Sequence, residues 1–209
     1  MIFIYSEKRK EIWFGVAFDE KQKIWASAFS VKGKRSLLSF IINHLPYNTN
    51  FTENVRKKQL LFARNVINVL EASYNGKCTK KYFNFAFAKL PKFTQSVLKT
   101  ALKIPHGYVT TYGNIAKELG KKRAPRAVGN SLAANPFPLL IPCHRVIRSN
   151  GKIGGYALGR EIKQSILRKE LEESRRKKQK LTNQGLLWIN RLNITLNSKI
   201  KEFPGLNNE

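Results

Sequence analysis

Strand-forming and helix-forming patterns occupy separate parts of this sequence, which limits how the chain can pack. Residues 12–18 and 23–29 are rich in Ile, Val, Trp, Phe and Ala, and four polar residues separate them. Such runs favour strands, and the short polar interval predicts an antiparallel hairpin, to which residues 2–5 would add a third strand. Residues 36–45 and 53–73 instead repeat apolar side chains at helical spacing. The first part of the chain is therefore predicted to form a small antiparallel sheet with helices.

Prolines and glycines divide the middle of the chain into short helices. A further strand is predicted at residues 82–88, and Leu90-Pro91 marks the boundary of a second unit. Beyond that boundary the pattern predicts helices at residues 94–102, 112–119 and 125–134. The last of these begins at a proline, which suits the first helical position because its missing N–H has no partner there. The last two helices together predict a helix-turn-helix.

The second helix of this pair has a composition suited to a DNA surface. Arg126 stands near its start, and small residues follow at Gly129, Ser131, Ala133 and Ala134. Small side chains let a helix approach another surface closely, and the free N–H groups of a helix N-terminus suit a phosphate. A plain helical hairpin in a protein core has the same pattern, so this feature alone leaves both interpretations open.

Charge favours the nucleic-acid interpretation. The chain holds 39 Lys and Arg residues against 13 Asp and Glu residues, which gives a net charge of +26. Residues 91–170 contain only three acidic residues, Glu118, Glu161 and Glu170. A positive field of this size attracts polyanions, of which nucleic acid is the commonest large one, although a solvated basic surface would carry the same charge. The charge therefore indicates the class of partner but not the reaction that the protein carries out.

Length and composition exclude several other classes of protein. A chain of 209 residues with 42% hydrophobic residues can bury a core in one medium or two small domains, so wholesale disorder is excluded. No apolar run approaches the roughly 20 residues of a membrane span, and the charged residues 7–10 interrupt any secretory signal. Two cysteines are too few for a disulfide framework, and with three scattered histidines they predict no metal site. We expect a cytoplasmic protein with no metal, no cofactor and no membrane partner.

One segment concentrates reactive side chains. Residues 137–147 are apolar and bracketed by prolines, apart from Cys143, His144 and an arginine. A thiol is a nucleophile only as the thiolate, so Cys143 needs a base, which the adjacent His144 would supply directly or through water. A carboxylate would orient the imidazole, and Glu161 and Glu170 are the nearest downstream candidates. A cysteine that is merely a small buried hydrophobe is the plain alternative.

This segment resembles the acceptor site of the O6-alkylguanine-DNA alkyltransferases, which repair alkylated guanine. The matching hexapeptide is Ile141-Pro142-Cys143-His144-Arg145-Val146. Further blocks match in the same order and spacing: Tyr112-Gly113-Asn114-Ile115-Ala116, Pro125-Arg126-Ala127-Val128-Gly129, Asn135-Pro136 and Gly155-Tyr156. The resemblance is strong from about Phe93 to Glu170, general before that range and absent after it.

The resemblance implies a catalytic role for five of the matching residues. Cys143 would be the alkyl acceptor, His144 the base that acts through water, and Glu170 the partner of His144. Asn135 would brace the active-site turn, and Tyr112 would donate to the guanine so that it leaves as a neutral base.

The resemblance also implies a set of substrate and DNA contacts. Arg126 would fill the base stack when the nucleotide rotates out, Tyr156 would lie on a lid loop near O6, and the helix-turn-helix would enter the minor groove. The full predicted set is Arg126, Tyr156, Ala157, Gly129, Ser131 and Arg145. Ala157 departs from the family, which usually has serine there, so a lid hydroxyl is lost while the backbone N–H stays.

With the resemblance included, the predicted fold is mixed α/β, of the α+β kind. Residues 1–90 would form a ribonuclease H-like domain with a small antiparallel sheet. Residues 91–172 would form a mostly helical domain that carries the helix-turn-helix and the alkyl acceptor. Residues 173–209 would hold a basic helix end and an extension of unknown role, and Cys78 has no predicted role.

The implied function is direct reversal of DNA damage. A monomer would bind double-stranded DNA, rotate O6-alkylguanine or O4-alkylthymine out of the duplex, and transfer the alkyl group to Cys143 once and irreversibly. One alternative is a DNA-binding regulator or lesion-recognition protein without transfer activity. Another is a cysteine hydrolase that uses Cys143 and His144 and turns over repeatedly.

Overall fold

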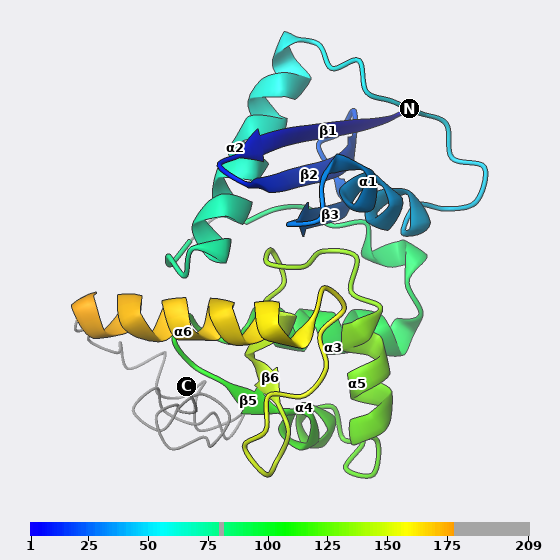
Figure 1. Cartoon of the computed structure of the whole chain (residues 1–209). Coiled ribbons are helices and arrows are strands. Elements are labelled where there is room, and N and C mark those ends of the chain that lie inside the picture. The colour runs from blue at the N-terminus through cyan, green and yellow to red at the C-terminus, as the bar shows by residue number, and fades with distance from the viewer. Residues whose placement is uncertain (80–81, 178–209) are drawn as a thin grey trace. The chain divides into compact units, whose positions relative to one another are not determined.

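The computed structural model describes residues 1–79 and 82–177, which form two compact units (Figure 1). The first unit contains Met1–Tyr74, Thr79–Leu90 and Pro136–Leu140. The second contains Asn75–Cys78, Pro91–Asn135 and residues 141–177. Each unit therefore includes one short segment that is remote in sequence from the rest of it.

The first unit is built on a four-stranded sheet in the order β3-β2-β1-β4. Its strands are β1 (Ile2–Arg9), β2 (Ile12–Asp19), β3 (Ile24–Ser30) and β4 (Phe51–Thr52). β2 pairs with β1 and with β3 in antiparallel register, whereas the short β4 runs parallel to β1. The three long strands confirm the predicted antiparallel sheet.

Two helices cover opposite faces of this sheet. α1 (Lys34–Asn43) lies on the face that carries Gly15, where an added methyl group would come within 2.8 Å of a leucine of α1. α2 (Lys57–Tyr74) lies on the face that carries Phe14, whose ring packs edge-on against Tyr74. Successive residues of a strand point to opposite faces, so these two contacts place one helix on each side. Burial on both faces explains why β2 is almost continuously apolar.

The strand predicted at residues 82–88 is wrong. Phe85 forms one isolated parallel bridge with Ile24, and the chain then enters a 3-10 helix, η1 (Phe87–Lys89). The backbone N–H groups of Phe87 and Leu90 donate to carbonyls only two and three residues earlier. Ile24 of β3 donates to the carbonyl of Asn84 and accepts from the N–H of Ala86, but the local turn that follows ends this pairing after a single bridge.

The second unit is mostly helical. Its helices are α3 (Lys92–Leu102), α4 (Tyr112–Glu118), α5 (Pro125–Ala133) and α6 (Arg160–Lys177). α4 and α5 pack against each other through side chains that are buried in both helices, namely Ile115, Ala116, Val128 and Leu132. The small sheet in the first unit and the helical second unit confirm the predicted mixed α/β class.

A short parallel pair of strands connects the helices of the second unit to its reactive turn. β5 (Thr110–Thr111) pairs with β6 (Val146–Ile147), and the 3-10 turn η2 (Cys143–Arg145) comes directly before β6. Thr111 also caps α4, because its hydroxyl accepts the backbone N–H of Asn114 at 3.1 Å. The pairing brings the first residue of α4 close to the cysteine, although two-residue strands leave no periodic signal in the sequence.

The last helix of the described chain, α6, begins at Arg160 as predicted. Residues 178–209, which include the predicted helix end and extension, lie outside the described residues. Within the described ranges, no helix is both long and apolar enough to cross a membrane.

The backbone of Gly76 lies close to α6, so a substitution at Gly76 tests how tightly this helix is packed. Its φ is +73°, and a Cβ at this position would lie 2.4 Å from the carbonyl carbon of Lys169. We expect Gly76→Ala to lower the free energy of unfolding by about 3 kcal/mol, because it adds a backbone clash to the cost of a left-handed conformation.

Gly120→Ala is the matched control, since Gly120 has φ = +69° and no atom within 4 Å of the added methyl group. Its expected cost is about 1 kcal/mol, from the conformation alone. Urea unfolding measures both variants, and equal losses would contradict the predicted clash.

Candidate active site

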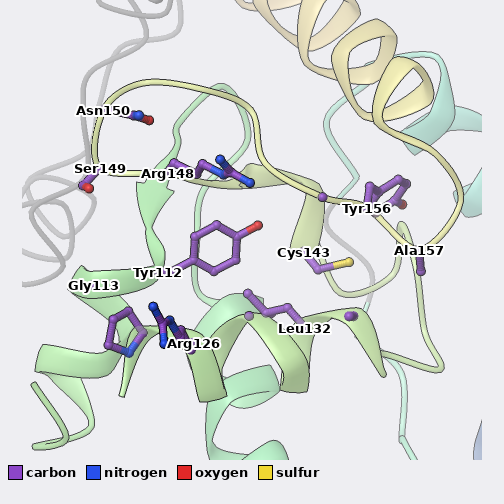
Figure 2. Close-up of a pocket in the computed structure, with 14 residues that line it drawn as sticks. Tyr112, Gly113, Arg126, Leu132, Cys143, Arg148, Ser149, Asn150, Tyr156 and Ala157 are labelled. Carbon is purple, nitrogen blue, oxygen red and sulfur yellow. The ribbon is translucent and has the colours of Figure 1, made fainter. Parts of the chain in front are cut away.

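The second unit contains an open pocket of about 720 Å³ (Figure 2). Figure 2 shows Tyr112 between the α5 side of the pocket, which carries Arg126, and a loop that carries Arg148. The predicted site residues in its lining are Tyr112, Arg126, Gly129, Cys143, Tyr156 and Ala157. The predicted site residues from four separate segments, one of them carrying Cys143, thus line one pocket.

Cys143 is held at the wall of this pocket by a short turn. Its backbone N–H donates to the carbonyl of Ile141 at 2.8 Å, and only 6% of the residue is exposed. The amide of Asn135 is buried beneath the turn, where Nδ2 donates to Cys143 Sγ at 3.1 Å and lies 3.4 Å from the Ile141 carbonyl oxygen. One side chain therefore braces both the backbone of the turn and the nucleophile.

The ionisation of Cys143 is a balance between burial and hydrogen bonding. Burial raises the pKa of the thiol above its ordinary value, because a thiolate is poorly solvated there. The Asn135 amide, the positive charge of Lys163 and nearby backbone N–H groups favour the thiolate and limit that increase in pKa. The thiol is therefore mostly protonated at neutral pH, and it requires a proton acceptor to react.

His144, Glu170 and Arg145 form a buried network next to the cysteine. His144 Nε2 lies 3.1 Å from Glu170 Oε1, and both side chains are almost fully buried. Arg145 donates from Nη2 to Glu170 Oε1 at 2.7 Å and from Nε to both carboxylate oxygens at 3.1 Å. A buried carboxylate needs such partners, because desolvation of an isolated charge is costly.

The charges in this network determine the tautomer of His144. Burial raises the pKa of Glu170, but Arg145 and His144 outweigh burial and hold that pKa well below its usual range. Burial also lowers the pKa of His144, despite the opposing effect of Glu170, so the imidazole is neutral at neutral pH. With an ionised carboxylate at Nε2, the ring proton belongs on that nitrogen, and Nδ1 is left as an acceptor. Nδ1 is buried and has no hydrogen-bond partner among the described residues.

Two tyrosines supply hydroxyl groups to the site. Burial raises the pKa of Tyr112, with Cys143 adding to the effect and Arg148 opposing it. Burial also raises the pKa of Tyr156 well above its ordinary value, and its hydroxyl has no hydrogen-bond partner among the described residues. Both phenols therefore stay protonated at neutral pH and can donate to a ligand.

Comparison with known proteins shows the family to which this chain belongs. Residues 92–172 match the family model described as 6-O-methylguanine DNA methyltransferase, DNA binding domain. A methylated-DNA–protein-cysteine methyltransferase of Methanosarcina mazei is 44% identical over 110 residues, which are 52% of this chain and 68% of that protein. Its counterpart in Thermococcus barophilus is 34% identical over 161 residues, which are 76% of this chain and 88% of that protein. The chain belongs to the methylated-DNA–protein-cysteine methyltransferase family.

Solved structures agree with this assignment. Mycobacterium tuberculosis OGT in complex with DNA has a TM-score of 0.64 and 26% identity, covering 83% of this chain and 94% of that one. The O6-methylguanine-DNA methyltransferase from Pyrococcus kodakaraensis strain KOD1 has a TM-score of 0.58 and 25% identity, covering 81% and 99%. The predicted membership of the alkyltransferase family is confirmed.

Two residues of the predicted DNA-contacting set are engaged elsewhere in this methyltransferase. Ser131 is buried, and its hydroxyl lies 3.2 Å from that of Thr94. It shares the buried face of α5 with Val128, three residues earlier, rather than the face that lines the pocket. Arg145 is bound to Glu170, so its guanidinium supports the active-site network, and its contact with DNA stays a prediction.

Arg145 is held on its other side as well, because its Nη1 donates to the carbonyl oxygen of Ile104 at 2.8 Å. Arg126, Gly129 and Ala157 do lie at the pocket, as their predicted roles require.

Lys163 and Arg148 also lie at the site, although no sequence motif predicted them. Arg148 lines the pocket, and Lys163 is fully buried below it, 5.8 Å from the centre of the Tyr112 ring. A signal for Lys163 was present, because it precedes the buried residues Ile166 and Glu170 at helical spacing. No group of His, Cys, Asp and Glu suited to a metal ion occurs among the described residues.

Replacement of Glu170 tests the buried network. We expect Glu170→Gln to lower the free energy of unfolding by about 3 kcal/mol at neutral pH, because it removes the ionic partner of Arg145. The pKa of Glu170 is lower in the folded state than its unfolded value of about 4.3, so the contribution is complete above that pH and declines below it. The difference between the two proteins should therefore shrink in acid.

Glu172→Gln is the control on the same helix, because Glu172 is exposed, and we expect it to change stability by less than about 0.5 kcal/mol. Urea unfolding as a function of pH measures all three proteins. A stability difference for Glu170→Gln that stays constant in acid would argue against its ionic origin.

Proposed function

We propose that this protein repairs DNA by transferring an alkyl group from O6 of guanine to Sγ of Cys143. The observation that carries the proposal is a single thiol at the wall of an open pocket, hydrogen-bonded to Asn135 and adjacent in sequence to a buried His144–Glu170 pair. The relatives from Methanosarcina mazei and Thermococcus barophilus are named methylated-DNA–protein-cysteine methyltransferases, and that name describes the same reaction.

The transfer is a displacement at carbon in which the protein supplies both the base and the acid. His144 Nδ1 accepts the thiol proton through a water molecule, and Glu170 stabilises the resulting imidazolium. The thiolate then attacks the alkyl carbon, so the S–C bond forms as the C–O6 bond breaks. Tyr112 donates its hydroxyl proton towards the departing base, which leaves as neutral guanine, and the proton taken from Cys143 replaces the one given up by Tyr112.

The product explains why each molecule would act once. Cys143 becomes a thioether, and an alkyl thiolate is a poor leaving group from an uncharged carbon. Within the described residues, no second cysteine lines the pocket to receive the group. Transfer is therefore stoichiometric and irreversible.

DNA would bind along the face of α5 that borders the pocket. Arg126 is exposed near the start of this helix, and Ala133 and Ala134 are exposed at its end. Such a helix presents little bulk to a minor groove, and the net charge of +26 favours a polyanion. α4 and α5 would act as the helix-turn-helix, and one monomer would bind one site on double-stranded DNA.

The alkylated base must leave the duplex before the sulfur can reach it. Extrusion of a base costs a few kcal/mol in lost stacking and pairing, and an inserted Arg126 would offset part of that cost. The pocket then receives the base between Tyr112 and the loop that carries Tyr156 and Ala157 (Figure 2). O4-alkylthymine presents the same alkyl–oxygen bond in a smaller ring, and we include it as a substrate.

Transfer to Cys143 can be measured directly by mass. Incubation with an O6-methylguanine duplex should add one methyl group per protein molecule, located on Cys143, and Cys143→Ser should add none. Cys78→Ser is the matched control and should behave as wild type, because Cys78 is not part of the pocket lining. DNA binding without methylation would indicate a regulator or lesion-recognition protein, and repeated turnover would indicate a hydrolase.

Arg126 should matter only when a base has to be extruded. We expect Arg126→Ala to slow transfer from duplex DNA by about ten- to a hundredfold, which corresponds to the few kcal/mol of lost stacking that Arg126 replaces. Transfer from the free base O6-benzylguanine should keep its wild-type rate. Arg35→Ala removes an exposed charge from α1 and serves as the control for net charge. Equal slowing on both substrates would exclude this role.

A further inference from the structure

Arg148 lines the pocket, and the transfer reaction described above gives it no role. Its place is set by the parallel pairing of β5 and β6, in which Thr111 lies beside Ile147. Tyr112 and Arg148 are the next residues of these two strands, so the same register brings them close together. A Cβ on Gly154 would lie 3.0 Å from the Tyr112 hydroxyl and 3.5 Å from Arg148 Cγ, so both side chains pass the same point of the chain. The stem of Arg148 is therefore fixed beside the tyrosine at the centre of the pocket.

The backbone of Arg148 is held by a tight turn, whereas its guanidinium is free. The backbone N–H donates to the carbonyl of Lys152 at 2.9 Å, and the carbonyl accepts the N–H of Gly151 at 3.0 Å. The side chain is exposed, and it forms no hydrogen bond or ion pair with another described residue. An anchored backbone with an unengaged guanidinium at a pocket wall is suited to binding a ligand rather than to supporting the fold.

The charge of the pocket wall indicates which group of a ligand this arginine meets. The described residues that line the pocket include two arginines, Arg126 on α5 and Arg148 across the pocket, and no aspartate or glutamate (Figure 2). An O6-alkylated guanine base carries no charge, so the base alone would leave both cations without a counter-ion. A nucleotide in DNA has a phosphodiester on each side, and these groups move with the nucleotide when it rotates out of the duplex. The anion that reaches the pocket is therefore a phosphate.

Of the two arginines, Arg148 is the one available to this phosphate. In the proposed function Arg126 enters the base stack, in the space that the nucleotide has left. Arg148 lies on the other side of Tyr112, so it stays with the extruded nucleotide. A guanidinium also presents its N–H groups as a planar fork that binds phosphate oxygens in pairs.

We propose that Arg148 binds a phosphate that flanks the rotated nucleotide, and thereby retains the nucleotide in the pocket while the sulfur reacts. This role rests on the proposed function, in which the substrate is a nucleotide rotated out of DNA. It differs from the role of Arg126, which offsets the cost of opening a duplex. Arg148 binds the nucleotide whether or not a duplex had to be opened.

Three substrates separate the two arginines: O6-methylguanine in a duplex, the same oligonucleotide as a single strand, and the free base O6-benzylguanine. Arg148→Ala should slow transfer from both oligonucleotides by about tenfold, which is the effect of losing one charge-assisted hydrogen bond. The free base has no phosphate and should react at the wild-type rate, which also shows that the pocket is intact. Arg126→Ala should slow transfer chiefly from the duplex.

Two control variants test the charge itself. Arg148→Lys keeps a positive charge and should keep most of the wild-type rate on both oligonucleotides. Arg35→Ala removes an exposed arginine outside the pocket and should leave all three rates unchanged. Slowing of Arg148→Ala on the free base would place the guanidinium on the base and overturn the proposal. Wild-type rates on both oligonucleotides would overturn it as well.

Uncharged phosphates identify the partner of Arg148. One phosphodiester beside the lesion is replaced by a neutral methylphosphonate, first on one side and then on the other. On wild type, one of these replacements should slow transfer by about tenfold. On Arg148→Ala the same replacement should have no further effect, because the interaction is already lost. Equal slowing of both proteins would show that arginine and phosphate act independently, and would overturn the proposal.

Binding provides the same comparison without any transfer. In a Cys143→Ser background, fluorescence anisotropy measures the affinity for the lesion oligonucleotide, and the losses from Arg148→Ala and from the methylphosphonate should again not add. Absence of methyl transfer by wild type, together with this coupling in binding, would refute the proposed function and leave the phosphate contact intact. Normal transfer without the coupling would refute the phosphate contact alone.

Discussion

The ion pair between Arg145 and Glu170 determines the chemistry available at Cys143. Burial alone would protonate the Glu170 carboxyl, and a protonated carboxyl would compete with His144 as a donor. The guanidinium keeps Glu170 ionised, so the imidazole directs its proton there and presents its other nitrogen as an acceptor. Nucleophile, histidine and arginine are consecutive residues of one 3-10 turn. The pair therefore fixes the turn that carries the sulfur as well as the tautomer of its base.

Burial of Cys143 has two opposing consequences. It raises the pKa of the thiol, which slows reaction at neutral pH, and it shields the sulfur from unrelated electrophiles. For an enzyme that turns over repeatedly, the slower reaction would matter more than the protection from other electrophiles. A molecule consumed by its own reaction loses more from a wrong alkylation than from a slow one. Donors such as the Asn135 amide then recover part of the reactivity without exposing the sulfur.

The sequence predicted those parts of the protein that depend on local signals. Gly120 and Pro125 delimit α4 and α5, and runs of β-branched and aromatic residues mark the three long strands. The sequence carries no sign of contacts between residues that are distant in the chain. Arg145 looked available for DNA because nothing nearby indicates that Glu170, on another helix, binds it. Ser131 was predicted to be part of a small-residue surface, but its hydroxyl lies within hydrogen-bond distance of the Thr94 hydroxyl on α3. The segment 82–88 has strand composition, yet it forms only one bridge with Ile24 before it turns into a 3-10 helix.

Ala157 has no side-chain hydroxyl, but the position of the loop that carries it depends on backbone contacts rather than on this side chain. The carbonyl of Gly155 lies within reach of the Lys163 ammonium, and Gly154 has φ = +77°, with the Tyr112 hydroxyl 3.0 Å from the position a Cβ would take. Both constraints act on the backbone before Tyr156, and neither involves the side chain at position 157. The loop is therefore held by the bond from Lys163 to its main chain, and its path past Tyr112 leaves little room for a Cβ at position 154. A serine at position 157 would therefore add one hydrogen-bond donor to the pocket and leave the support of the loop unchanged.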